Sequence, residues 1–303
     1  MNAEIRACRR CGFCHPRLVL GLSSAPSLAD SYLSAGDRLA YRIVGHGSPV
    51  IVLAGGPGLD AAYMMPIAEE VAAAGHQAIL PELRGTGASR DAAKDAAMLS
   101  VAGSIADIEA LRVAVGAERV VLLGHSFGGG MAQAYAQAHP GQVAGLILLD
   151  SVGTELSPAP DAALAQSWMQ RLGPDDQAAY ATARAKGDTL AAIKLKFRAS
   201  ISDPVKAKVF TDSLPPIAEP SVQERLSAAF KADYHVTAGE TAFPVAIIYG
   251  AQDWIRAWQP ALSAAYPRAS VALIPETCHF PWIDDPAGTA GAIAAALKRT
   301  TYR

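Results

Sequence analysis

Short, continuous apolar segments alternate with helix-like segments along most of this 303-residue chain. The segments PVIVLA (49–54), RVVLLGH (119–125), VAGLILLD (143–150) and PVAIIYG (244–250) have the length of strands and carry few polar residues. Strands that are apolar throughout are buried on both faces, and such strands joined through helices form a parallel sheet between two helical layers. The pattern therefore predicts an α/β fold with a mostly parallel central sheet and helices on both faces.

The alternation stops between residues 152 and 241. This segment contains alanine-rich, helix-like pieces such as SVQERLSAAFKAD, and it has no apolar run of the kind found in buried strands. Strand-helix alternation then resumes at PVAIIYG. We therefore expect residues 30–151 and 242–303 to form the α/β core, and residues 152–241 to form an inserted helical lid.

Residues 1–29 do not share the pattern of the core. Four arginines precede a short apolar stretch, LVLGL, and small residues end the segment at Ala29. These are the parts of a weak secretory signal peptide, although the apolar part is shorter than the usual ~7–15 residues, and a disordered extension fits equally well. We expect a cytoplasmic protein, or an exported one if residues 1–29 act as a signal peptide.

Three of the four cysteines, Cys8, Cys11 and Cys14, lie close together in this leader, beside His15. A structural zinc site usually combines two such clusters across a loop, and the sequence has only one. We therefore expect no metal site.

The overall charge and hydropathy exclude two classes of partner. The formal net charge is −2, and the sequence has no basic stripe with interleaved aromatic residues, which argues against nucleic acid binding. No apolar run approaches the roughly 20 residues that a membrane span needs. We therefore expect a small-molecule or short-peptide substrate as the partner.

A glycine-flanked serine stands where the apolar segment 119–125 meets a helix-like segment. The stretch GHSFG places Ser126 between Gly124 and Gly128. A strand that turns sharply into a helix brings these two positions so close that side chains would collide there, which explains a glycine at both. Such a turn also strains the serine backbone and exposes its hydroxyl. We therefore expect Ser126 to be a catalytic nucleophile.

A serine hydroxyl needs a general base, and the base needs an acid that fixes its tautomer. His279 follows the last apolar strand, in a loop that opens at the same edge of a parallel sheet as Ser126. Asp253 follows the preceding strand, and the order Ser126, Asp253, His279 is the usual order for a serine on such a turn. We favour Asp253 as the acid, and Asp150, at the end of LILLD, remains the alternative.

Two backbone N–H groups are expected to form an oxyanion hole. Phe127 follows the nucleophile and supplies one of them. The second should come from the loop GGPG after the first buried strand, where Pro57 has no N–H and Gly56 is the better donor.

These motifs resemble those of serine hydrolases with the α/β-hydrolase fold, from about residue 31 to the C-terminus. The combination of GGPG and GHSFGG is similar to the proline-iminopeptidase-like branch, whose loop usually reads HGGPG and whose catalytic histidine commonly follows a glycine. Ala54 and Cys278 occupy those two positions here. Other contacts must therefore hold the loop, and the resemblance implies the mechanism more firmly than the substrate.

We interpret the chain as a serine hydrolase that cleaves a small carboxylic ester or amide through an acyl-enzyme intermediate, without a cofactor. A proline-iminopeptidase-like aminopeptidase is the alternative, and a ligand receptor that retains the hydrolase fold is a third reading from a different class. A serine nucleophile argues against the branches that use aspartate. From their positions in the chain, Tyr63, Met64 and Trp282 are expected to line the substrate pocket.

Overall fold

The computed structural model describes residues 30–156, 168–214, 220–237 and 239–300. Its centre is an eight-stranded sheet with the order β1-β2-β4-β3-β5-β6-β7-β8. Strands β1 and β2 are antiparallel to their neighbours, and all other pairs are parallel. The mostly parallel sheet that the sequence predicts is therefore confirmed. The strands are β1 (Asp30–Ser34), β2 (Asp37–Val44), β3 (Ser48–Leu53), β4 (His76–Pro81), β5 (Val120–His125), β6 (Val143–Leu149), β7 (Val245–Gly250) and β8 (Ser270–Ile274).

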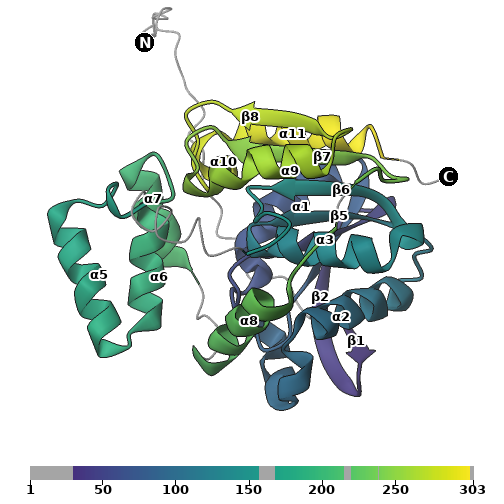
Figure 1. Ribbon diagram of the computed structural model, residues 1–303, viewed down its shortest axis with the longest axis horizontal. Helices are drawn as coiled ribbons and strands as arrows, with labels where there is room; N and C mark the ends of the chain where they lie inside the picture. The colour runs from purple at the N-terminus through teal and green to yellow at the C-terminus, as the bar shows by residue number, and fades with distance from the viewer. Residues whose placement is uncertain (1–29, 157–167, 215–219, 238, 301–303) are drawn as a thin grey trace, which may run out of the picture.

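Helices cover both faces of this sheet (Figure 1). One hydrophobic cluster contains α2, α3 and α9, and the other contains α1 and α11. The α-helices of the core are α1 (Met65–Ala73), α2 (Val101–Ala114), α3 (Phe127–Ala138), α9 (Gln259–Ala265), α10 (Pro281–Asp284) and α11 (Pro286–Leu297). Short 3₁₀ helices are η1 (Ala61–Met64), η2 (Gly87–Lys94), η3 (Ala96–Met98), η4 (Pro140–Gln142) and η5 (Trp254–Trp258).

The two clusters explain why the central strands are apolar at every position. Along β3, Ile51 and Leu53 belong to the cluster of α2, α3 and α9, whereas Val50 and Val52 belong to the cluster of α1 and α11. Successive side chains of a strand point to opposite faces, so a strand between two helical layers buries both sets. All six residues of β5 are buried for the same reason.

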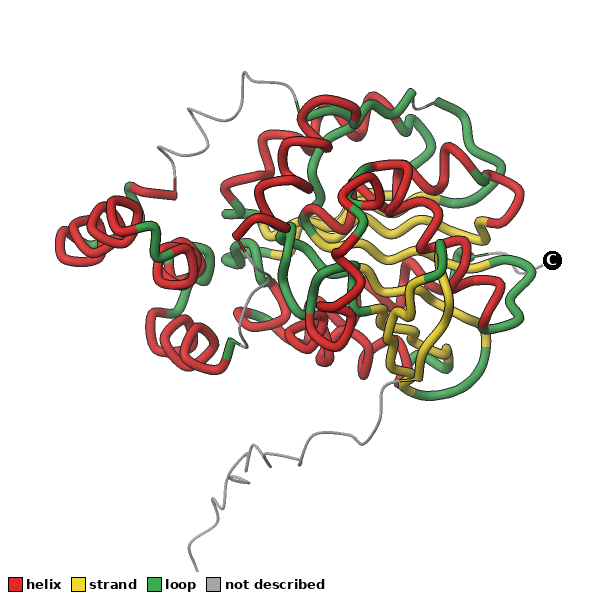
Figure 2. The backbone as a smooth tube through the Cα atoms, turned by 90° about the horizontal axis from the view of Figure 1, so that it is seen from below, coloured by secondary structure: helices red, strands yellow, loops and turns green. Residues whose placement is uncertain are grey.

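The segment between β6 and β7 is helical. Its helices are α5 (Pro174–Lys186), α6 (Thr189–Arg198), α7 (Pro204–Ser213) and α8 (Pro220–Asp233). Figures 1 and 2 show α5, α6 and α7 as one group to the side of the core, whereas α8 lies against the core near α2. Asp188 and Asp203 begin α6 and α7, and each carboxylate accepts hydrogen bonds from backbone N–H groups of the first turn.

The parallel strands bring several loops to one edge of the sheet. The segments that follow the carboxyl ends of β3, β5, β6, β7 and β8 all leave the sheet at this edge, because parallel strands end on the same side. These loops carry the residues for which the sequence predicts a catalytic role. Within the described ranges, no helix is long and apolar enough to cross a lipid bilayer.

Candidate active site

Ser126 lies on a strained turn between β5 and α3. Its backbone has a φ of 56° and a ψ of −121°, a conformation that residues with a side chain rarely adopt. A Cβ atom on Gly124 would overlap the carbonyl oxygen of Gly128, and one on Gly128 would overlap that of Leu53. The glycines therefore permit the close packing of β5, α3 and β3 that holds the turn. The Ser126 side chain remains partly exposed.

The structure brings Ser126, His279 and Asp253 together. Nε2 of His279 lies 3.1 Å from Oγ of Ser126, and Nδ1 of the same ring lies 3.0 Å from Oδ2 of Asp253. His279 and Asp253 are buried. This is the geometry in which a carboxylate holds an imidazole with its free nitrogen toward a hydroxyl group.

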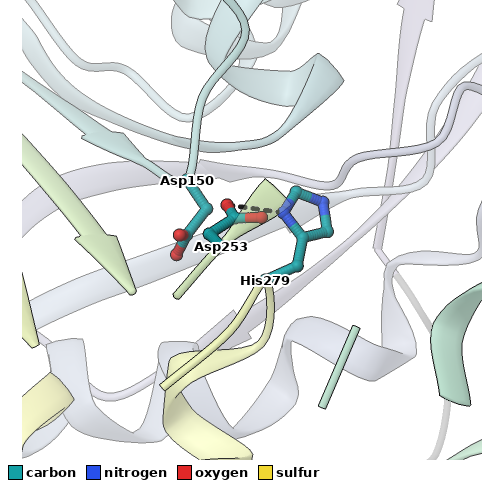
Figure 3. A group of neighbouring side chains, drawn as sticks. All are labelled: Asp150, Asp253 and His279. Carbon is teal, nitrogen blue, oxygen red and sulfur yellow. Dashed lines mark hydrogen bonds and ion pairs between the residues drawn. The ribbon is translucent and has the colours of Figure 1, made fainter. Parts of the chain in front are cut away.

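Asp150, the alternative acid, contacts Asp253 rather than His279. Figure 3 shows the Asp253 carboxylate between Asp150 and the imidazole. The Asp150 side chain is fully buried, and its Oδ1 accepts a hydrogen bond from the Gly250 N–H at 2.8 Å. Burial, and then the nearby charge of Asp253, raise the pKa of Asp150 well above its usual value. Asp150 therefore retains its proton at pH values at which a free carboxyl group has lost it.

The residues expected to form the oxyanion hole lie beside Ser126. Phe127 is the first residue of α3, where a backbone N–H has no acceptor within the helix. Gly56 follows β3, and both residues line the cavity that reaches Ser126. The N-terminus of α3 also favours negative charge at this point.

Tyr63 holds the loop that contains Gly56. Its hydroxyl accepts a hydrogen bond from the Gly55 N–H at 2.6 Å and lies 2.9 Å from Nδ1 of His125. On the other side of the His125 ring, Nε2 lies 2.9 Å from the carbonyl oxygen of His279. A carbonyl oxygen can only accept, so Nε2 carries the proton and Nδ1 accepts from the Tyr63 hydroxyl. The network joins the loop after β3 to the segments that carry Ser126 and His279.

This network supplies the contact that Ala54 cannot make. The sequence implied that something other than a histidine at position 54 must hold the loop, but it did not point to Tyr63. His125 is fully buried and packs against His279 with ring centroids 4.7 Å apart. Burial, and then the nearby His279, lower the pKa of His125 well below its usual value. A neutral His125 is what the assigned hydrogen bonds require.

A cavity of about 390 Å³ opens at Ser126. Its floor is formed by the catalytic edge, including Gly56, Phe127 and His279. The helical segment between β6 and β7 contributes much of the remaining wall. The wall residues from this segment are Val152, Leu156, Trp168, Tyr180, Lys196, Phe197, Ser227 and Lys231.

The three residues expected to line the pocket lie elsewhere. Met64 is fully buried in the core beside α1. Tyr63 and Trp282 flank the His125 ring from the core side and line a separate hollow near Phe210. Tyr63 lies near Ser126 and His279, as its position in the chain suggested. Its side chain, however, takes part in the hydrogen-bond network with Gly55 and His125 and does not line the cavity.

One group of side chains has the composition of a metal site. Asp150, Asp253 and His279 offer ligand atoms that lie within 4.8 Å of one another. Metal binding requires deprotonated ligands, and the raised pKa of Asp150 keeps a proton on that carboxyl group. His279 already uses Nδ1 toward Asp253. These three side chains are therefore better suited to hydrogen bonding with one another than to binding a metal ion. Cys8, Cys11 and Cys14 lie outside the described residues.

The family model for the α/β hydrolase fold matches residues 48–286 of this chain. The chain belongs to the α/β hydrolase fold family. This match covers strands β3 to β8, the turn at Ser126 and the segments that carry Asp253 and His279. It confirms the fold and the family that the sequence motifs predict.

Proline iminopeptidases are among the relatives of this family member. The chain is 37% identical over 124 residues to a probable proline iminopeptidase of Streptomyces coelicolor, covering 37% of this chain and 36% of that protein. It is 35% identical over 109 residues to a proline iminopeptidase of Saccharolobus solfataricus, covering 36% and 34%. The similarity thus spans about a third of the length of these relatives. It confirms the resemblance to the proline-iminopeptidase-like branch.

Solved structures share the fold over nearly the whole chain. An esterase from Thermogutta terrifontis matches with a TM-score of 0.68 and 20% identity, covering 91% of this chain and all of that one. A proline iminopeptidase of Mycobacterium smegmatis matches with a TM-score of 0.64 and 19% identity, covering 89% and 98%. At this level of identity the likeness shows the fold alone.

Proposed function

We propose that this protein is a serine hydrolase that cleaves a small carboxylic ester or amide through an acyl-enzyme intermediate. The observation that carries the proposal is the pair of contacts made by His279, 3.1 Å from the Ser126 hydroxyl and 3.0 Å from the Asp253 carboxylate. A hydroxyl, an imidazole and a buried carboxylate in this order activate serine as a nucleophile.

The reaction begins when His279 takes the proton of Ser126 while Oγ attacks the substrate carbonyl carbon. The backbone N–H groups of Gly56 and Phe127 stabilise the negative charge that develops on the carbonyl oxygen. His279 then gives the proton to the leaving alcohol or amine as its bond to carbon breaks. A water molecule repeats the sequence on the acyl-enzyme and releases the acid. Asp253 stabilises the charged imidazolium and keeps its ring oriented.

A proline-iminopeptidase-like activity is the second candidate, because the relatives that match at 35–37% identity carry that name. An aminopeptidase must hold the free ammonium group of its substrate, usually through carboxylates. Among the described residues that line the cavity there is no aspartate or glutamate. This ranks the aminopeptidase below the esterase or amidase.

We also propose that residues 152–241 act as a lid over the site. Five of the described residues that line the cavity from this segment lie on α5, α6 or α8, and Phe230 of α8 packs on Phe127 with ring centroids 4.3 Å apart. The segment therefore limits the size of the substrate that can reach Ser126.

A panel of model substrates tests the proposed function. The purified protein is assayed with p-nitrophenyl esters and with aminoacyl-naphthylamides, including the prolyl compound, and Ser126→Ala is the matched control. We expect ester turnover that disappears in Ser126→Ala. Turnover of the prolyl compound alone would favour the aminopeptidase. Binding of esters without turnover above the Ser126→Ala background would favour a receptor.

A further inference from the structure

The helical segment between β6 and β7 contacts the catalytic base directly. Ser200 lies just after α6 and is fully buried, and its carbonyl oxygen accepts a hydrogen bond from the His279 N–H at 3.1 Å. The Ser200 hydroxyl oxygen accepts another, at 3.2 Å, from Nε1 of Trp254, the residue directly after Asp253. One residue of this segment therefore holds the backbone of the base and the neighbour of the acid.

The last turn of α6 fixes the direction of the Ser200 hydroxyl group. This hydroxyl donates to the Lys196 carbonyl oxygen at 2.9 Å, so its oxygen is left to accept from the indole N–H of Trp254. The Trp254 ring in turn packs beside the imidazole of His279, with ring centroids 5.4 Å apart. The Ser200 hydroxyl thereby orients a side chain that packs on the catalytic ring.

Arg171 connects the loops of the acid and the base from a second point of this segment. Its Nη2 donates to the Gln252 carbonyl oxygen at 2.6 Å, and its Nη1 donates to Sγ of Cys278. Gln252 and Cys278 directly precede Asp253 and His279 in the chain. A guanidinium group is planar and rigid, so two contacts made by one such group restrict the distance between the two loops.

The backbone of the core also joins these two loops. The Gln252 N–H donates to the Thr277 carbonyl oxygen at 2.9 Å. The contacts of Ser200 and Arg171 come instead from the segment between β6 and β7, so two separate parts of the chain hold the loops. The 3.0 Å hydrogen bond between the acid and the base spans the loops and depends on their separation.

Resting on the proposed hydrolase function, we propose that Ser200 and Arg171 are positioning residues that keep Asp253 and His279 at hydrogen-bonding distance. The segment between β6 and β7 therefore supports the catalytic residues in addition to covering them. Neither Ser200 nor Arg171 is among the described residues that line the cavity at Ser126. Their loss should lower the rate of the chemical steps and leave substrate binding nearly unchanged.

Steady-state kinetics of single and double variants test the proposal. The full-length protein, Arg171→Met, Ser200→Ala and the variant with both changes are assayed with p-nitrophenyl acetate and p-nitrophenyl butyrate. Ser126→Ala gives the background. We expect each single change to lower kcat by about tenfold and the double change by up to about a hundredfold, with KM within about twofold of that of the unmodified protein.

Arg171→Lys separates the charge of Arg171 from its two contacts. The variant keeps the positive charge, but a lysine ends in one compact ammonium group that cannot reproduce both contacts of the guanidinium group. Its kcat should therefore fall about as far as that of Arg171→Met. A normal kcat in Arg171→Lys would mean that Arg171 acts through its charge, which would overturn its positioning role.

A double-mutant cycle with Asp253→Asn identifies the interaction through which the two residues act. Asp253→Asn has already lost the carboxylate that must be held at His279. Adding Arg171→Met or Ser200→Ala to it should therefore lower kcat by less than about twofold further. A residue that merely stabilises the fold would lower the free energy of unfolding in urea and leave kcat unchanged in both backgrounds.

Arg184→Met and Ser213→Ala are the matched controls. Arg184 is exposed on α5, and the Ser213 hydroxyl donates to the Phe210 carbonyl group within α7. Both variants should leave kcat and KM unchanged. Far-ultraviolet circular dichroism checks that each variant is folded, and Arg171→Met, at an exposed position, decides the proposal if Ser200→Ala fails this check.

The outcomes separate this inference from the proposed function. Turnover that depends on Ser126 but is unchanged in the variant with both changes would overturn the positioning role and leave the hydrolase in place. A rise in KM at constant kcat, or losses that multiply with that of Asp253→Asn, would also overturn it. If neither ester shows turnover that depends on Ser126, the proposed function and the inference both fall.

Discussion

The Tyr63 hydroxyl lies 2.9 Å from Nδ1 of His125, the residue directly before Ser126, and accepts a hydrogen bond from the Gly55 N–H. One buried side chain thereby links the loop of Gly56 to the turn of the nucleophile. The other nitrogen of His125 donates to the carbonyl group of His279. The side chains of Tyr63 and His125 thus fix the positions of three loops that are distant in sequence. Neither side chain takes part in the proposed bond-making steps.

Tyr63→Phe should damage this network without removing the ring. The change leaves the Gly55 N–H and Nδ1 of His125 without their partner in a buried site, which costs about 1–3 kcal/mol in the free energy of unfolding. Small displacements of a catalytic group cost up to about 100-fold in rate, so kcat should fall by about ten- to a hundredfold with little change in KM. Urea denaturation and ester kinetics measure the two effects. Tyr41→Phe, outside this network, is the control, and equal losses in both variants would speak against a positioning role for Tyr63.

Substitution of the two buried aspartates should have different effects on activity. Asp253→Asn should fold but lose about 10⁴-fold in turnover, because the amide cannot stabilise the imidazolium. Asp150→Asn should retain most of its turnover, since Asp150 contacts Asp253 and not His279. Steady-state kinetics of the two variants decide the assignment. The opposite result would make Asp150 the acid of the triad.

The raised pKa of Asp150 should make this residue a source of pH-dependent stability. The folded protein keeps this proton over a pH range in which the unfolded chain, with a carboxyl pKa near about 4, has lost it. The folded state then binds more protons, so the contribution of Asp150 to stability falls as pH rises above about 4, by up to about 1.4 kcal/mol per pH unit until the raised pKa is reached.

Asp150→Asn removes this contribution. The difference in unfolding free energy between Asp150→Asn and the unmodified protein should therefore grow in favour of the variant as pH increases, as measured by denaturation at several pH values. Asp91→Asn, at an exposed position, should give a difference that is flat with pH. A flat difference for Asp150→Asn as well would mean that the buried carboxyl group ionises as it does in the unfolded chain.

Ser126 and His279 should act as one unit. Ser126→Ala and His279→Ala should each lower turnover by up to roughly a million-fold, and the double variant should be little worse than either, because removal of one partner already disables the other. Single-turnover and steady-state assays with an activated ester measure this. Losses that multiply in the double variant would mean that the two residues contribute independently.

The helices between β6 and β7 should open more readily than the sheet. Lid segments that admit a substrate belong to the less stable parts of a protein. Hydrogen exchange should therefore be faster in α5 than in β5, and a phosphonate bound to Ser126 should slow it. Exchange of the His279 amide should be slower than that of the amides of α5, because the His279 N–H donates a hydrogen bond to the Ser200 carbonyl group. Ser126→Ala with the same phosphonate is the control, and exchange in α5 as slow as in β5 would argue against a moving lid.

Much of the fold could be predicted from the sequence because the determining interactions are local or periodic. A strand between two helical layers is apolar at every position, and this pattern is visible in 119–125 and 143–149 without coordinates. The turn at Ser126 requires glycine at Gly124 and Gly128 because the backbone itself comes too close there. Local sterics therefore predicted the strained turn at Ser126 before any tertiary contact was known.

The choice of the acid depended on distance, which the sequence does not contain. Asp150 and Asp253 both follow buried strands that end at the catalytic edge, and chain order alone favoured Asp253. The structure places only the Asp253 carboxylate on Nδ1 of His279 and puts Asp150 behind it. Two carboxyl groups that are equivalent in the sequence thereby acquire different environments, and burial raises the pKa of Asp150.

Tertiary structure alone decided what surrounds the catalytic residues. Tyr63 was expected in the pocket wall because it is near the catalytic loops in the chain, but its hydroxyl reaches Gly55 and His125 instead. Lys196 and Lys231 carry no local motif, and they line the cavity at Ser126 only because of where α6 and α8 are packed. Periodicity determines which side of an element is buried, whereas the partners of a side chain depend on how separate elements pack, and no short stretch of sequence specifies that packing.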